Sequence, residues 1–194
     1  LYAPGWVRKN YMECLGGSVD EVLMDDIDAD GQGWEGSQYN NGWHGALIEI
    51  QEILEDYDRY ETASLWNYPK FCQMFYSRIP LITGYYTPQI GDSGNTASKD
   101  IWMTSDVAKT GWKHFRDPVF AQILYMFNGN SLDGLHYDFT EENPERLETE
   151  VQSVIDEYGE FTQISEAMTN FGFAVLRAGA DYKIDSDGVT VTVS

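Results

Sequence analysis

The spacing of apolar residues changes near residue 158, and this change restricts the possible folds more than any other feature of the sequence. Before it, apolar residues recur at steps of three and four, which is the period of an amphipathic helix. One such face is formed by Leu147, Val151, Val154 and Ile155. After Gly159, short apolar runs take over, and residues 189–193 alternate strictly between Val and Thr, as in a strand. The sequence therefore predicts a helical part over residues 1–158 and a β part over residues 159–194.

Capping residues, prolines and glycines divide these two parts into shorter elements. Helices are expected over residues 6–15, 18–25, 45–57, 62–75, 100–109, 118–127 and 144–158, and strands over residues 161–164, 173–176 and 189–193. Pro69 either lies in the first turn of its helix or splits that helix in two. Residues 79–98 are rich in Pro and Gly and are expected to form a long structured loop, a type of segment that is often functional.

The stretch over residues 30–45 is the most informative one for function. Its content of Gly and Asn is too high for the interior of a helix, so a loop between two helices is expected. The same stretch contains Trp34, Tyr39, Trp43 and His44, which offer aromatic surface and ionisable groups to a ligand. A loop that carries such side chains on a rigid scaffold is a candidate binding or catalytic loop. The alternative is a surface loop whose aromatic residues only pack.

The beginning of this stretch resembles the signature of the heparinase II/III-like polysaccharide lyases, a family that includes alginate, heparin and heparan sulfate lyases. In that signature an Asp-Gly pair is followed by an aromatic residue, a Glu, a small pair and a Tyr. The matching residues here are Asp30-Gly31, Trp34-Glu35, Gly36-Ser37 and Tyr39. Two later passages resemble the same family in the same order, namely residues 79–80 with 88–93, and residues 172–177. The resemblance covers roughly residues 20–180.

The resemblance implies a mainly α fold in which part of an (α/α) toroid is followed by the first strands of an antiparallel β-sandwich. It implies cleavage of a uronic-acid polysaccharide by β-elimination, with Tyr39 as acid or base and without a cofactor. It also implies a periplasmic or secreted location. The family places an Asn or His well upstream of this Tyr and a His in the sandwich, but Asn10 lies too close to Tyr39 to match. We therefore expect a piece of a longer protein that is inactive without the remainder of its own chain.

Each candidate site residue also has a structural interpretation. A phenol has an ordinary pKa near 10, so Tyr39 acts as a base only where a neighbour stabilises the phenolate, and otherwise it is a packed Tyr with a bonded hydroxyl. Glu35 matches the Glu of the family and is expected to hold the loop or to contact the sugar. Trp34 and Trp43 are either stacking surfaces for sugar rings or core residues. His44 either polarises the substrate or packs at the start of a helix beside Trp43.

Two other motifs compete with the lyase interpretation. Residues 26–31 read Asp-Ile-Asp-Ala-Asp-Gly, which satisfies the opening of an EF-hand calcium loop. The twelfth position of that loop is Ser37 instead of a bidentate Glu, so a high-affinity calcium site is not expected. Residues 91–94 read Gly-Asp-Ser-Gly, as around the nucleophile of trypsin-like proteases, but no suitable His and Asp accompany them. We expect Asp92 to hold the loop at the rim of the cleft, and no metal site.

Composition excludes several classes of partner. The chain has 32 acidic and 12 basic residues and a formal net charge of −20, which argues against nucleic acid or an anionic membrane. It has no run of about eighteen apolar residues that would span a membrane. The charge disfavours highly sulfated substrates unless basic residues line a local groove. Cys14 and Cys72 are too few for a disulfide framework and are expected to be buried free thiols.

The sequence thus predicts a fragment of a polysaccharide lyase that acts on an acidic polysaccharide. The alternative from another class is a non-catalytic, acidic carbohydrate- or calcium-binding module. Absorbance of the unsaturated product separates the two, as does calcium-dependent stabilisation that is lost in Asp28→Asn.

Overall fold

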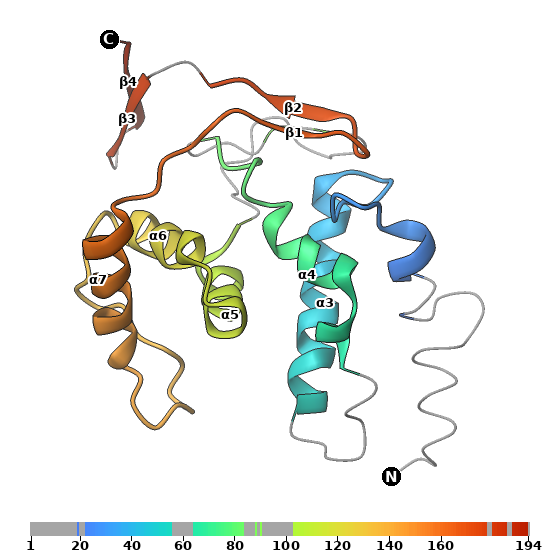
Figure 1. The fold of residues 1–194 in the computed structure, drawn as a ribbon, viewed down its shortest axis with the longest axis horizontal. Coiled ribbons are helices and arrows are strands. Elements are labelled where there is room, and N and C mark those ends of the chain that lie inside the picture. Colours follow the sequence, from blue (N-terminus) through green and yellow to red (C-terminus); the bar gives the residue numbers. More distant parts are fainter. Residues whose placement is uncertain are drawn as a thin grey trace. The chain divides into compact units, whose positions relative to one another are not determined.

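The computed structural model describes residues 19, 22–55, 64–83, 88, 90, 103–177, 180–185 and 188–193. The chain divides into two compact units, and Figure 1 labels helices and strands of both. The first unit consists of Leu1–Trp102 and Glu166–Val175, and the second consists of Met103–Ser165 and Leu176–Ser194. Over the described residues the fold is mainly helical with short antiparallel β-hairpins, as the sequence predicts. None of the described helices is long and apolar enough to cross a membrane.

The described residues of the first unit form four helical segments and one hairpin. The helical segments are the π-helix η1 (Val22–Asp26), α3 (Ser37–Glu55), the 3-10 helix η3 (Leu65–Asn67) and α4 (Pro69–Tyr76). The hairpin pairs β1 (Glu166–Met168) with β2 (Phe173–Val175), and its register matches Glu166 with Val175 and Met168 with Phe173. The core of the first unit contains fully buried side chains from η1, η3 and α4 and from the residues that follow these helices. They are Leu23, Ile27, Leu65, Phe71, Met74, Phe75, Leu81 and Ile82.

Helix α3 begins at Ser37, so the prediction of a loop over the whole of residues 30–45 is wrong. Gly42 and Gly45 each lower helix stability by about 1 kcal/mol relative to Ala. A helix of 19 residues with one packed face outweighs this cost, because most helical stability in proteins comes from tertiary packing. The packed face consists of Asn40, His44, Leu47 and Gln51. The loop is therefore restricted to the residues before Ser37, and Tyr39 lies in the first turn of α3.

Pro69 splits the helix expected over residues 62–75, which was one of its two predicted effects. Tyr68 has an extended backbone, with φ −98° and ψ 111°, because the residue before a proline avoids the helical region. Pro69 then starts α4, at a position where its missing N–H costs nothing. Cys72 of α4 is half-buried and is a free thiol, and burial raises its pKa. Cys14 lies outside the described residues.

Three helices and a hairpin are described in the second unit. They are α5 (Ser105–Phe115), α6 (Pro118–Phe127) and α7 (Arg146–Tyr158), followed by β3 (Ala180–Asp185) paired antiparallel with β4 (Gly188–Val193). The predicted helix over residues 118–127 is confirmed, and the Asp117 carboxylate caps it by accepting a hydrogen bond from the Val119 N–H at 3.1 Å. The helix expected over 100–109 instead begins at Ser105. Thr104 caps it, because its side-chain oxygen accepts a hydrogen bond from the Val107 N–H.

The predicted strand over residues 161–164 is wrong, since these residues form no strand and Ile164 is 64% exposed. Pairing begins only at Glu166. The strand expected over residues 189–193 is confirmed as part of β4, which begins at Gly188, the register partner of Asp185.

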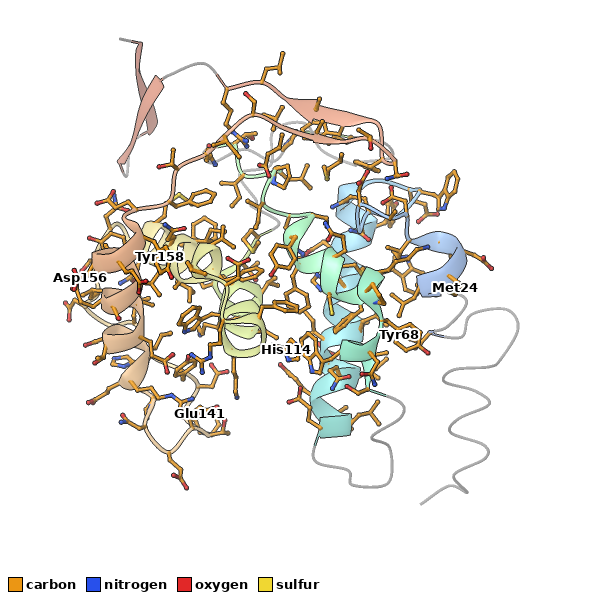
Figure 2. All side chains as sticks on the ribbon, in the orientation of Figure 1. Met24, Tyr68, His114, Glu141, Asp156 and Tyr158 are labelled. Carbon is orange, nitrogen blue, oxygen red and sulfur yellow. The ribbon has the colours of Figure 1, made fainter. Side chains whose placement is uncertain are left out.

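Glu150 joins α5, α7 and the irregular segment between α6 and α7. Its Oε2 accepts hydrogen bonds from Trp112 Nε1 at 2.8 Å, Arg116 Nη1 at 2.8 Å and the Tyr137 hydroxyl at 2.6 Å. Burial alone would raise the pKa of Glu150, but these hydrogen bonds outweigh burial and lower it. Burial and the bond to Glu150 raise the pKa of Tyr137 to about 12. A second carboxylate, Glu141 in Figure 2, forms ion pairs with Lys113 and Arg146 nearby.

Replacing Glu150 with alanine is expected to lower the free energy of unfolding of the second unit by about 2–3 kcal/mol. The buried Trp112 and Tyr137 would each lose a hydrogen-bond partner. A buried donor left without a partner destabilises the fold by the free energy of its desolvation. Glu150→Gln keeps one acceptor oxygen and should lose less. Denaturant unfolding measures both, with exposed Glu142→Ala as the matched control. Equal stability of Glu150→Ala and Glu142→Ala would contradict the proposed role of this network.

Candidate functional site

Residues 28–36 form a tight loop, called the site loop below, that leads into α3. A β-bridge between Ile27 and Gly33 closes its base. The Asp28 N–H donates to the Gln32 carbonyl at 2.9 Å, and Asp28 Oδ1 accepts from the N–H groups of Asp30 at 2.8 Å and Gln32 at 3.2 Å. Side-chain oxygens of Asp often order turns in this way. The carboxylate of Asp28 thus organises the loop from within.

Gly31 allows the site loop to lie directly against the backbone of α4. Its φ of +82° is one that side-chain-bearing residues rarely adopt, and a Cβ there would lie 2.6 Å from the backbone C and O of Gln73. The Gly31 carbonyl accepts from Asn40 Nδ2 at 3.1 Å and lies 3.1 Å from the Ser77 hydroxyl. Gln32 Nε2 donates to that hydroxyl at 2.9 Å. The loop, α3 and α4 are therefore held together by buried polar contacts.

Lys70 holds the backbone directly before the site loop. Its ammonium donates to the Met24 carbonyl at 2.7 Å and to the Ile27 carbonyl at 2.5 Å. Met24 itself, labelled in Figure 2, is 63% exposed on η1. Because its donors are directed at these carbonyls, Lys70 acts as a brace between α4 and the residues that precede the loop.

Three predicted site residues present aromatic surface to solvent. Trp34 is 81% exposed, yet its indole N–H donates to the Asp25 carbonyl at 3.0 Å, so the ring is anchored by its edge. Tyr39 and Trp43 are 48% and 47% exposed and lie four residues apart on α3, which places them on one side of the helix. Glu35 is exposed in the site loop between Trp34 and α3. Anchored, exposed rings are surfaces on which the apolar faces of sugars can stack.

His44, the remaining predicted residue, lies in the core of the first unit. It has no exposed surface, and its ring makes edge contacts with Phe71 at 5.8 Å and Phe75 at 4.4 Å between centroids. Neither ring nitrogen has a hydrogen-bond partner among the described residues. Its position is also well inside α3, not at the helix start as expected. The structure thus separates His44 from the exposed Trp34, Tyr39 and Trp43.

Acidification below about pH 6.5 is expected to destabilise the first unit through His44. Burial, and to a lesser degree the charge of Arg78, lowers the pKa of His44 well below its ordinary value of 6.5. The unfolded chain therefore binds a proton that the folded chain excludes. The free energy of unfolding should fall as pH drops from 6.5 towards the lowered pKa, by at most about 1.4 kcal/mol per pH unit.

Denaturant unfolding between about pH 7.5 and 5 measures this dependence. His44→Phe should reduce the slope because the substituted ring does not titrate. The matched control is His136→Gln, at an exposed histidine of the second unit, which should keep the slope. An identical slope in His44→Phe and the unsubstituted chain would contradict the assignment.

The site loop also bonds to a segment 140 residues further along the chain, a contact that the sequence does not indicate. Asp30 Oδ2 accepts from the N–H groups of Asn170 at 2.5 Å and Phe171 at 3.1 Å, and Asp30 Oδ1 accepts from Asn170 Nδ2 at 3.3 Å. Both donors lie in the turn of the β1–β2 hairpin, within the first unit. Asp30 lies in the first passage of the lyase resemblance, and both donors directly precede its third passage, residues 172–177.

The carboxylates of residues 26–31 do not converge as the ligands of a calcium loop do. The carboxylate of Asp28 accepts hydrogen bonds from within the site loop, that of Asp30 accepts them from the hairpin turn, and that of Asp26 is exposed. Among the residues that the structure describes, no group of three or more His, Cys, Asp or Glu is placed to hold a metal ion. Asn10 and the Gly-Asp-Ser-Gly motif at 91–94, including Asp92, lie outside the described residues.

The candidate site is therefore the site loop together with the first two turns of α3. It offers a phenol, a carboxylate and two indoles on a braced backbone. No protein-family model, curated protein or solved structure matches the chain.

Proposed function

We propose that the chain is part of a polysaccharide lyase that cleaves a uronic-acid polysaccharide by β-elimination, with Tyr39 as the acid or base. The observation that carries the proposal is the half-exposed Tyr39 in the first turn of α3, beside a loop that presents Trp34 and Glu35 to solvent. The loop is braced by Asp28, Lys70 and the Gln32–Ser77 contact. A rigid backbone with exposed reactive and stacking groups is what positioning a polymer requires.

The reaction needs one proton removed and one delivered. A base takes the proton from the carbon next to the uronate carboxylate, a carbon–carbon double bond forms, and the glycosidic carbon–oxygen bond breaks. The leaving oxygen then receives a proton, so that a single hydroxyl group can serve both steps in turn. The start of α3 carries the positive end of the helix dipole, which favours an anionic sugar near Tyr39. Trp34 and Trp43 would stack on sugar rings, and Glu35 would accept hydrogen bonds from sugar hydroxyls.

We also infer the larger architecture from the resemblance. The helices of the chain would belong to an (α/α) toroid, and the later strands to the beginning of a β-sandwich. The groups that neutralise the substrate carboxylate would then lie in the remainder of a longer chain, in the periplasm or outside the cell. The bonds from Asp30 to the hairpin support this proposal, because they join the first passage of the resemblance to the residues directly before its third passage, within one unit.

The first test is absorbance of the unsaturated product formed by the full-length chain on alginate, hyaluronan, chondroitin and heparan sulfate. We expect product, and more from unsulfated than from highly sulfated polymers, because the exposed Asp25, Asp26 and Glu35 surround the site with negative charge. No product from any of these polymers would contradict the lyase proposal. Binding that depends on Trp34 but yields no product would instead favour a non-catalytic carbohydrate-binding module.

A further inference from the structure

The Asp30 carboxylate uses both of its oxygens to hold the turn of the β1–β2 hairpin. Oδ2 receives two backbone N–H groups and Oδ1 receives the Asn170 side chain. Gly172, with φ +79°, completes the turn, and its N–H donates to the Met168 carbonyl at 2.8 Å. Hydrogen bonds to an ionised acceptor are about twice as strong as neutral ones. The turn is therefore docked by a charge-assisted contact and not only by strand pairing.

The same residue is connected to Tyr39 by a short series of contacts. Asp30 precedes Gly31, whose carbonyl accepts from the buried Asn40 side chain at 3.1 Å. Asn40 follows Tyr39 in the first turn of α3, and its own N–H donates to the Gly36 carbonyl at 3.1 Å. A shift of the loop at Asp30 would thus be transmitted to the start of α3. Gly31 restricts that shift on one side because it lies against the backbone of Gln73.

We propose that Asp30 is a positioning residue of the candidate site. By docking the hairpin turn, its carboxylate fixes the site loop and with it the orientation of Tyr39. This role rests on the proposed lyase function. It also accounts for an acidic residue in the loop of an enzyme with an anionic substrate, since the donors of Asn170 and Phe171 compensate the charge.

The test compares Asp30→Ala, Asp30→Asn and Asp26→Ala in the full-length chain. Asp26 is the matched control because it is an exposed carboxylate four residues away. The first measurement is amide hydrogen exchange at Asn170 and Phe171, which does not depend on activity. We expect about tenfold faster exchange in Asp30→Ala and no change in Asp26→Ala. Asp30→Asn should lie between them, because an amide oxygen can still accept the two backbone N–H groups.

The second measurement is steady-state formation of the unsaturated product. Loss of positioning should lower kcat roughly 10- to 100-fold in Asp30→Ala while KM changes by less than about twofold, with partial recovery in Asp30→Asn. Faster exchange with unchanged kcat, or unchanged exchange, would each overturn the proposal. A full-length chain without lyase activity would refute the proposed function and with it the positioning role, whereas the exchange data would still decide whether Asp30 docks the hairpin.

Discussion

Tyr39→Phe in the full-length chain is expected to reduce lyase activity by a factor of about 10² to 10⁴. The substitution removes only the hydroxyl group, which is the group that would take and deliver the proton. KM should change much less than kcat, because the aromatic ring remains available for contact with the sugar. Since Tyr39 is 48% exposed, the free energy of unfolding should change by less than about 0.5 kcal/mol.

The matched control is Tyr158→Phe, at the end of α7 in the second unit (Figure 2), where the tyrosine is 57% exposed. This variant should keep full activity. Product absorbance gives the rates, and thermal unfolding verifies that each variant is folded. Unchanged activity in a folded Tyr39→Phe protein would exclude this hydroxyl from the chemistry and direct the search to other proton donors and acceptors.

Gly31→Ala is expected to lower the free energy of unfolding of the first unit by about 2–4 kcal/mol. The backbone at φ +82° disfavours any residue with a Cβ, and the added atom would meet the Gln73 backbone at 2.6 Å. Neither partner can yield without moving the site loop or α4. Because the Gly31 carbonyl also accepts from Asn40, such movement would weaken that contact as well.

Gly42→Ala in α3 is the matched control for this prediction. A Cβ at Gly42 meets no described atom within 4 Å, so alanine should stabilise the helix by about 0.5–1 kcal/mol. Denaturant unfolding of both variants measures the change in the free energy of unfolding, which should be negative for Gly31→Ala and positive for Gly42→Ala. A Gly31→Ala protein as stable as the unsubstituted chain would mean that the loop does not rest on α4 as described.

Local signals made part of this fold predictable. Residues 118–127 were recognised as a helix because Asp117 caps it, Pro118 suits its first position and Asn128 follows its end. The alternation over residues 189–193 was sufficient for a strand. In each case the determining interactions lie within a few residues of the element they define.

Tertiary contacts decided the features that were predicted wrongly or missed. Propensity placed Gly42 and Gly45 in a loop, but the packing of Asn40, His44 and Leu47 inside the first unit extends α3 through them. Of the four residues of α3 described as buried, three are polar, so hydrophobic periodicity gave little indication of that face. The Asp30 contact could not be predicted because its partners are 140 residues away and carry no matching pattern.

The hairpin docked by Asp30 also has a consequence for the biosynthesis of the protein. The first unit takes its helices from before residue 103 and its hairpin from Glu166–Val175, with much of the second unit encoded between them. During translation, the early helices leave the ribosome long before the turn that Asp30 binds. Domains generally fold as units as they emerge, so the first unit must wait for the later segment. Until then Asp30 has no hairpin partner, and nascent chains halted shortly after residue 102 should therefore be more sensitive to proteases in the site loop than chains that extend past residue 175.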